Sequence, residues 1–280
     1  MLALVGFSFL LMLLCLHAQA FVLSLLAHQP MQASLAEVSS NVGCLGLAQL
    51  VGLGVPALVV LRLTTPPRPW FALHEAFASV PGVQLVCAFF AGISLQLPMC
   101  EIAQLVSQAF PSLAPSAADE ARMMSLLSLN SSYRAIAIPL ALVVIAPLTE
   151  ELLFRHLVQR SFLAHAPSIV VLPIVAMLFA AFHLDPHAFF SIAVAGLALG
   201  ALAHRHQSIR ISLAMHSGVN LVPVLVQPAW LAIPGLNSGT VGEHVPLVWL
   251  LPSALLCVIF FALALQARPL GAASRGPHLR

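Results

Sequence analysis

Three ionisable side chains stand inside a long apolar segment of this chain. Glu150, Glu151 and Arg155 fall in a hydrophobic run that begins near residue 135. At the centre of a bilayer each such group costs roughly 2.5–3.5 kcal/mol, whereas a neighbouring Leu or Val returns only about 0.3–0.6 kcal/mol. The cluster therefore cannot face lipid, and it must face a protein interior or a water-filled cavity. Ionisable groups in such a position indicate a functional site.

The apolar segment around Glu150 is one of many in the chain. The sequence has 280 residues, of which 60% are hydrophobic and 7% are charged, and this composition is typical of a protein that crosses a membrane several times. The formal net charge of +2 gives no indication of a nucleic-acid partner. We predict an all-α, multi-pass transmembrane helical bundle of about eight spans.

Apolar runs place these spans at residues 2–26, 42–61, 80–97, 135–163, 168–183, 188–203, 211–231 and 246–265. Residues 101–133 are more polar, and we expect a loop there with one or two helices at the membrane surface. The basic side chains, all of them Arg, favour an orientation with both termini in the cytoplasm, because only Arg122 and Arg134 then lie outside. The Lys-free, Ala-rich composition favours a bacterial plasma membrane.

The spacing within the charged cluster divides it into two parts. On a helix, Glu151 and Arg155 are four residues apart with the acid first, which is the favourable order for an ion pair. Glu150 points roughly 100° away from that pair. We interpret Glu151 and Arg155 as structural support and Glu150 as the free, reactive carboxylate. A single structural network of all three groups is the alternative at this point.

Two further spans carry polar side chains that could meet Glu150. Glu150 and His183 stand about 15 and 17 residues from the tip of one helical hairpin, so we expect them at the same level. His216 and Asn220 are four residues apart and share a helix face. The alternatives are that His183 merely ends its span, and that His216 and Asn220 hydrogen-bond between helices.

Taken together, these residues form three patterns. They are EExxxR (Glu150, Glu151, Arg155), FxxxH (Phe179, His183) and HxxxN (His216, Asn220). In this order on membrane helices they resemble the CPBP family, which includes the type II CAAX prenyl endopeptidases and the bacteriocin-processing and immunity-associated ABI proteins. The family usually has Gly after the motif Arg, and this chain has His156 there.

The resemblance implies a division of the chain and a chemistry. It places a catalytic core at residues 135–231, after N-terminal transmembrane segments and a loop (1–134) and before a last transmembrane helix and tail (232–280). Glu150 and His183 would activate a water molecule, and His216 and Asn220 would bind the developing oxyanion. In a metal-dependent version, Glu150, His183 and His216 would ligate a divalent metal, which would be Zn²⁺.

The expected activity is that of an intramembrane endopeptidase. Its substrate would be a membrane-embedded or membrane-associated peptide or protein, including a lipid-modified peptide, and the lipid bilayer would be its second partner. Two other classes of protein fit the same residues. One is a non-catalytic immunity or scaffold protein that binds a partner through the polar cavity, and the other is a small proton-coupled carrier.

Overall fold

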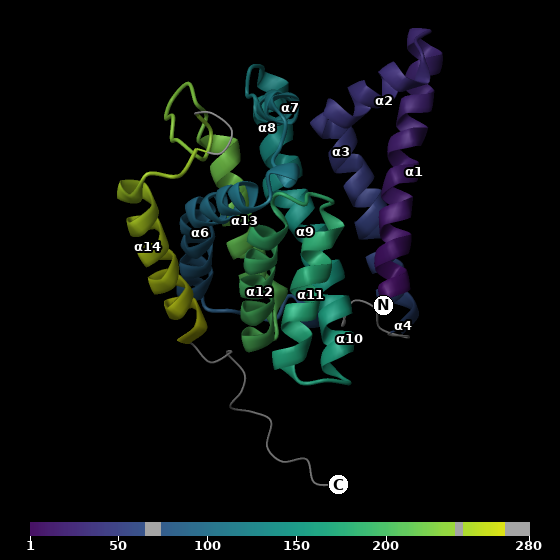
Figure 1. The fold of residues 1–280 in the computed structure, drawn as a ribbon. Helices are drawn as coiled ribbons and strands as arrows, with labels where there is room; N and C mark the ends of the chain where they lie inside the picture. Colours follow the sequence, from purple (N-terminus) through teal and green to yellow (C-terminus); the bar gives the residue numbers. More distant parts are fainter. Residues whose placement is uncertain (65–73, 239–242, 267–280) are drawn as a thin grey trace.

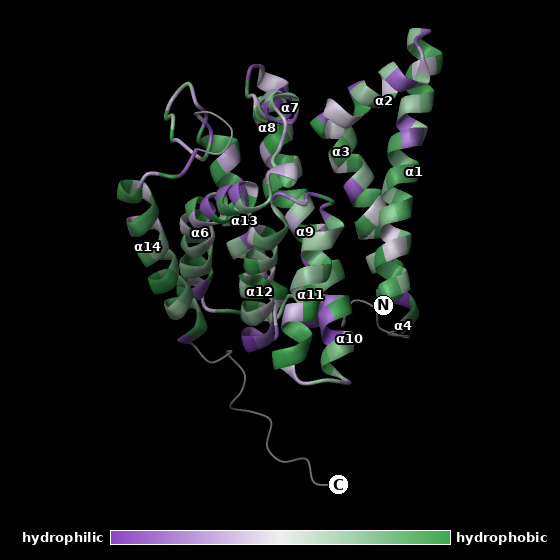
Figure 2. Cartoon of the chain, viewed as in Figure 1, coloured by the Kyte–Doolittle hydropathy of each residue, from purple (hydrophilic) through white to green (hydrophobic). Residues whose placement is uncertain are grey.

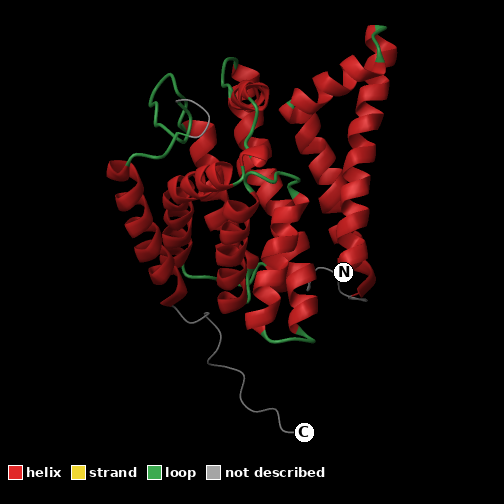
Figure 3. Ribbon diagram, in the orientation of Figure 1, coloured by secondary structure: helices red, strands yellow, loops and turns green. Residues whose placement is uncertain are grey.

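The computed structural model describes residues 1–64, 74–238 and 243–266, and the regular elements there are helices (Figure 3). The first half contains α1 (Leu2–Ala27), α2 (Met31–Ser40), α3 (Val42–Gln49), η1 (Leu50–Gly54), α4 (Val55–Thr64), α6 (Gly82–Ala109), η2 (Pro111–Leu113) and α7 (Ala117–Leu127). The second half contains α8 (Ser132–Pro139), η3 (Leu140–Ile145), α9 (Ala146–Glu150), η4 (Glu151–Gln159), α10 (Arg160–Leu163), α11 (Ser168–Phe182), α12 (Phe189–His206), α13 (Ile209–Leu225) and α14 (Leu247–Gln266).

Six helical stretches in the described part of the chain are long and apolar enough to cross a membrane. They are Leu2–Ala27, Val42–Leu63, Gly82–Ala109, Ser132–Leu163, Phe189–His206 and Leu247–Gln266. The apolar helices Ser168–Phe182 and Ile209–Leu225 are shorter. These eight stretches correspond to the eight spans expected from the sequence, so the predicted multi-pass helical bundle is confirmed.

Three details of the prediction are wrong. The seventh span, predicted over residues 211–231, is α13, which begins at Ile209 and ends at Leu225. The third span does not end at residue 97, because α6 continues through Pro98 to Ala109. Glu101, which suggested a loop, is satisfied within the structure: its carboxylate accepts hydrogen bonds from the ring of His244 (2.7 Å) and the backbone N–H of Val245 (3.0 Å). The helix α2 was not expected at all.

The surface helix predicted between residues 101 and 133 is α7. Its first turn is fixed by a capping box in which Ser116 and Asp119 exchange side-chain and backbone hydrogen bonds. The hydrogen bonds from Ser116 also lower the pKa of Asp119, since they stabilise its charged form. The helix thus starts at a position that the sequence pattern specifies.

The helices form a bundle with α1 at one edge and α14 at the other (Figure 1). Helix α6 packs most extensively on α13 and α14, and α11 packs on α12. Hydrophobic residues cover most of α11 and α14, and hydrophilic residues gather at α10 and at the lower end of α12 (Figure 2). The start of α1 and the end of α14 lie toward the same end of the molecule in Figure 1.

Three segments of the bundle are π-helical. They are η1, η3 and η4, and the last two flank the short helix α9 inside the long span from Ser132 to Leu163. π-Helical turns are rare and occur frequently at functional sites. Glu150 lies at the junction of α9 and η4, so the backbone changes its winding at the residue that the sequence singled out.

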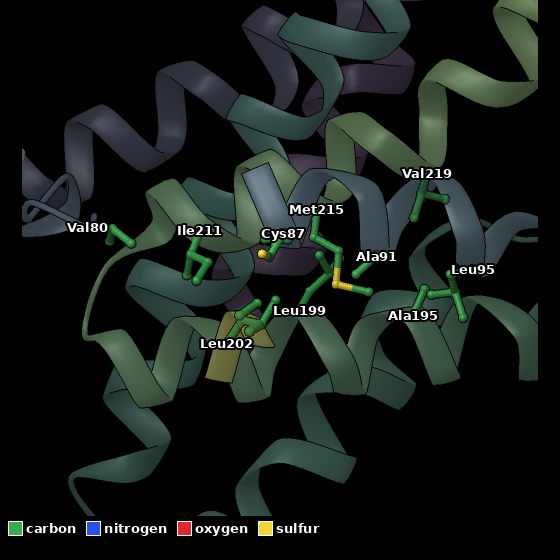
Figure 4. Packing of buried hydrophobic residues seen from close by; sticks show 12 residues of the cluster. Val80, Cys87, Ala91, Leu95, Ala195, Leu199, Leu202, Ile211, Met215 and Val219 are labelled. Carbon is green, nitrogen blue, oxygen red and sulfur yellow. The ribbon is translucent and has the colours of Figure 1, made fainter. Parts of the chain in front are cut away.

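A hydrophobic cluster holds α13 in place between α6 and α12. It includes Cys87, Ala91 and Leu95 from α6, Ala195, Leu199 and Leu202 from α12, and Ile211, Met215 and Val219 from α13 (Figure 4). Ile211 and Met215 are fully buried. This packing matters for the site because Met215 immediately precedes His216.

Two glycines let α6 and α13 approach at backbone distance. A Cβ atom on Gly92 would lie 2.0 Å from the carbonyl oxygen of Met215, and one on Gly218 would lie 2.2 Å from that of Phe89. Real Cβ atoms do not approach a backbone atom so closely, and therefore each position requires glycine. The two contacts, at Met215 and Gly218, lie on either side of His216 in α13 and fix its position along the helix axis.

We expect the variants Gly92→Ala and Gly218→Ala to be destabilised by roughly 1–3 kcal/mol, because the added methyl group must push two helices apart. Thermal unfolding in detergent measures the loss. Gly6→Ala in α1 is the matched control, since a Cβ there meets nothing within 4 Å. Alanine is favoured over glycine in a helix by about 1 kcal/mol, so that control gains stability or stays unchanged. A Gly218→Ala variant as stable as this control would contradict the packing argument.

Candidate active site

Three elements bring the polar side chains predicted from the sequence to one point. Glu150 ends α9, His183 caps the C-terminus of α11, and His216 lies in the middle of α13. The Oε2 atom of Glu150 is 4.0 Å from Nε2 of His183 and 3.7 Å from Nε2 of His216. The hairpin lengths predicted that Glu150 and His183 would be level, and the structure places them so. Glu150 and His216 are buried, whereas the side chain of His183 is 30% exposed.

Each histidine ring is oriented by a hydrogen bond from its other nitrogen. His183 donates from Nδ1 to the carbonyl oxygen of Phe179, one turn earlier in α11, at 2.8 Å. His216 donates from Nδ1 to Oε1 of Glu151 at 3.0 Å. Both Nε2 atoms are thereby turned toward the same oxygen of Glu150. A fixed Nδ1–H bond leaves Nε2 as the nitrogen that can accept or deliver a proton.

Glu151 has more partners than the single one expected. It is fully buried, and its Oε2 lies 3.4 Å from Nε of Arg155, which is the ion pair predicted from the spacing. Its Oε1 holds His216. One carboxylate therefore neutralises a buried cation and orients a ring of the site at the same time.

Phe179 is a second organising residue, to which the sequence analysis assigned no role. Its ring lies 4.8 Å from that of His183 and 5.7 Å from that of His216, both in edge-to-face geometry. The guanidinium carbon of Arg155 stands 4.8 Å from the ring centroid. Such a cation–π contact compensates part of the cost of burying the charge. The aromatic residue of FxxxH thus packs between both histidines and the supporting arginine.

The prediction that Glu150 is a free carboxylate needs correction. Gln49, at the end of α3, donates from Nε2 to Oε1 of Glu150 at 2.5 Å. The other oxygen, Oε2, is buried and has no hydrogen-bond partner within the described residues. Only one oxygen of Glu150 is therefore available. Sequence reasoning missed Gln49 because it lies 101 positions away, although a glutamine inside an apolar span was a signal.

Asn220, the last residue of HxxxN, forms its hydrogen bond with a different helical segment. Asn220 donates from Nδ2 to the carbonyl oxygen of Leu142 at 2.8 Å, and Ser217 donates to that of Val143 at 2.8 Å. Both carbonyls belong to η3, so these bonds attach α13 to the π-helical segment. An amide nitrogen carries a second N–H. The oxyanion-binding role of Asn220 stays a prediction that depends on that second donor.

His156, at the position where the family usually has glycine, lies on another side of the helix. It is buried and lies beside Arg160, with Nη1 of Arg160 3.3 Å from its Nδ1. It lines a small cavity with Arg155, Gln159 and Ala203, and no hydrogen bond or ion pair in the described part of the chain joins it to Glu150.

In the metal-dependent version of the site, Glu150, His183 and His216 would be the ligands, and carboxylate and imidazole groups are donor types that zinc accepts. Among residues 1–64, 74–238 and 243–266, no group of three or more His, Cys, Asp or Glu side chains is arranged to hold a metal ion. Zn²⁺ remains a prediction from the resemblance.

Residues 132–222, about a third of the chain, match the family model described as Rce1-like, type II CAAX prenyl endopeptidase. The matched region contains Glu150, His183, His216 and Asn220. This region of the chain is thus Rce1-like, and the resemblance inferred from the three patterns is confirmed. At the level of the family, the match indicates a CAAX-type intramembrane protease. Neither the curated proteins nor the solved structures gave a match to the chain.

We expect Glu151→Gln and Arg155→Ala to lower the free energy of unfolding by about 3–5 kcal/mol, because each leaves a buried charge unpaired. Glu150→Gln should cost much less, since the new amide oxygen can still accept the hydrogen bond from Gln49. Yield after purification and thermal unfolding in detergent measure the difference. Equal stability of the three variants would refute the supporting role of Glu151 and Arg155.

Cysteines placed at positions 150 and 183, in a chain without its five native cysteines, should be joined by a short bifunctional thiol reagent. The two native side chains approach to 4.0 Å, so a short bridge suffices. A pair at positions 150 and 165 is the control, because residue 165 lies about 22 Å along the helix from Glu150. Failure of the 150/183 pair with reagents of several lengths would contradict the arrangement of α9 and α11.

Proposed function

We propose that the protein is an intramembrane endopeptidase that hydrolyses a peptide bond in a membrane-associated or lipid-modified peptide. The observation that carries the proposal is the position of Oε2 of Glu150. This oxygen is buried, has no hydrogen-bond partner among the described residues, and faces Nε2 of His183 and of His216. A carboxylate in that setting is suited to take a proton from a water molecule.

In the first step, the water molecule lies between Glu150 and His183. Oε2 of Glu150 accepts one of its protons while the water oxygen attacks the carbonyl carbon of the scissile bond. Nε2 of His183 accepts the second O–H hydrogen bond and keeps the oxygen lone pair directed at the substrate. Because His183 is the exposed member of the pair, the peptide approaches from its side.

The attack leaves a negative charge on the former carbonyl oxygen. His216, while its Nδ1–H stays on Glu151, can donate from Nε2 to that oxygen when its ring carries both protons. A donor that is held in place before the reaction is an effective way to stabilise an oxyanion. Asn220 would add its second N–H from one turn further along α13.

In the last step the bond between carbon and nitrogen breaks. The proton that Glu150 took from water passes to the leaving nitrogen, so an amine and a carboxylic acid result and Glu150 returns to its charged form. Atoms and protons balance with water as the only co-reactant. The buried position of the site keeps these electrostatic contacts strong.

A cavity of about 460 Å³ has Asp185 in its wall, although Glu150, His183 and His216 do not line it. It lies between α6, α7, the start of α12 and the loop at residues 235–238. Asp185, which follows His183 by two residues, lines it together with Met99, Met123 and Met124. Methionine side chains adapt to different partners, and the volume is within the range of ligand-binding pockets. We infer that a flanking segment of the peptide binds here.

The metal-dependent mechanism stays a second proposal that uses the same residues. It rests on the resemblance and on the donor types of Glu150, His183 and His216, and metal analysis of the purified protein distinguishes it from the metal-free one. The cytoplasmic position of both termini and a bacterial plasma membrane also remain proposals, supported by the Arg distribution and the composition.

The function is tested by a survey of protein termini in membranes from cells that make the wild type or Glu150→Gln at matched levels. We expect new N- and C-termini only with the wild type, because the variant keeps its fold and loses the proton acceptor. Glu37→Gln, on exposed α2, is the control and should behave as the wild type.

If the wild type and Glu150→Gln gave the same termini while both were folded, the endopeptidase would be refuted. A partner bound by both proteins would then indicate the immunity or scaffold class. Proton-dependent transport in liposomes that is lost in Glu150→Gln would indicate the carrier class.

A further inference from the structure

The side chain of Gln49 joins the N-terminal helices to the candidate active site. Its Nε2 donates to Oε1 of Glu150 across 101 positions of sequence. Gln49 lies in α3, outside the Rce1-like region at residues 132–222 and outside the core predicted from the motifs. None of the three sequence patterns includes it.

This hydrogen bond gives the two oxygens of Glu150 different surroundings. Oε1 is fixed by the amide of Gln49, and Oε2 faces the two histidines at 4.0 Å and 3.7 Å without a hydrogen-bond partner in the described residues. A carboxylate with one anchored oxygen cannot turn freely about its last bond. The hydrogen bond from Gln49 therefore holds Oε2 of Glu150 where the water molecule must be deprotonated. A displacement of a catalytic group by about 1 Å can lower the rate about 100-fold.

The backbone around Gln49 is built for this approach. Gly46 and Gly54 stand on either side of it, and both contact the helix that carries Glu150. A Cβ atom on Gly46 would lie 3.2 Å from Cβ of Ala141, and one on Gly54 would lie 3.4 Å from Cγ2 of Thr149. Small residues at these two places let the helices come close enough for a glutamine side chain to reach the carboxylate.

Gln49 also lies at a change of helical winding, as Glu150 does. The helix passes from α3 into the π-helical segment η1 directly after Gln49, and from α9 into η4 directly after Glu150. π-Helical turns occur frequently at functional sites. Both partners of the hydrogen bond are thus placed by the same uncommon backbone feature.

We propose that Gln49 is a positioning residue for Glu150, so that the N-terminal helices complete a site whose other residues lie in the Rce1-like region. The inference rests on the proposed function, because it assigns Gln49 to the carboxylate that takes the proton. A purely structural glutamine is available for comparison. Gln19 in α1 donates to the backbone carbonyl of Cys44 at 3.2 Å and joins two helices without touching the site.

The test compares Gln49→Leu with Gln19→Leu, using a fluorogenic peptide that carries the cleavage sequence found by the survey of termini. Gln49→Leu should lower kcat about 10–100-fold with KM within a factor of two, as for other residues that orient a reactive group. Gln19→Leu should lower the unfolding temperature and leave kcat unchanged. Wild-type kcat in a folded Gln49→Leu variant would overturn the inference.

Gln49→Met is the second variant, and it keeps the length of the side chain without a hydrogen-bond donor. We expect it to lose kcat as Gln49→Leu does, because neither side chain can hold Oε1 of Glu150. Wild-type kcat in a folded Gln49→Met variant would contradict the hydrogen-bond role, since only the packing of the side chain would then matter.

The contact can be examined even if the protein cleaves nothing. In a double-mutant cycle of thermal unfolding, Gln49→Leu and Glu150→Ala should have non-additive effects, because each variant removes one side of the same hydrogen bond. If the wild type cleaved nothing while positions 49 and 150 were coupled in stability, the proposed endopeptidase activity would be refuted. The contact between the two side chains would still be supported. Additive effects would refute the inference whatever the outcome for proteolysis.

Discussion

The buried ion pair between Glu151 and Arg155 is the interaction on which the site depends. Arg155 can stay within an apolar bundle only because Glu151 balances its charge and Phe179 covers its guanidinium. The same carboxylate holds the ring of His216 on another helix. Fold stability and the orientation of a reactive ring are therefore properties of one side chain. A change at Glu151 cannot alter one of them and leave the other intact.

The spacing of residues in the sequence predicted the contacts between residues that are close in sequence or on consecutive helices. The spacing of four positions from Glu151 to Arg155 was enough to expect their pair. The lengths of chain on either side of the turn before α11 were enough to expect Glu150 beside His183. Nothing local joins Gln49 to Glu150 or Asn220 to Leu142, because these contacts depend on how closely separate helices pack. The extension of α6 beyond Pro98 was missed for the same reason, since the partner of Glu101 is His244, far along the chain.

Helices outside the Rce1-like region support the site within it. The Rce1-like match stops at residue 222 and starts at residue 132, yet the carboxylate within it is held from α3 and its α13 helix is held by Gly92 of α6. A segment comprising only the matched residues would lack both supports. The division of the chain into a core and flanking parts follows the sequence patterns. It does not follow the contacts, because the core depends on α3 and α6 to hold Glu150 and α13.

The two short apolar helices have a consequence for the surrounding lipid. α11 has 15 residues and α13 has 17, so they rise about 23 and 26 Å, less than the roughly 30 Å of a hydrocarbon core. A membrane adapts to short elements by thinning around them. Lipid would then be shallow above His183, which caps the shorter helix. Under the proposed function, the acyl chain length of the surrounding lipids would then set the distance that a polar peptide crosses to reach Glu150.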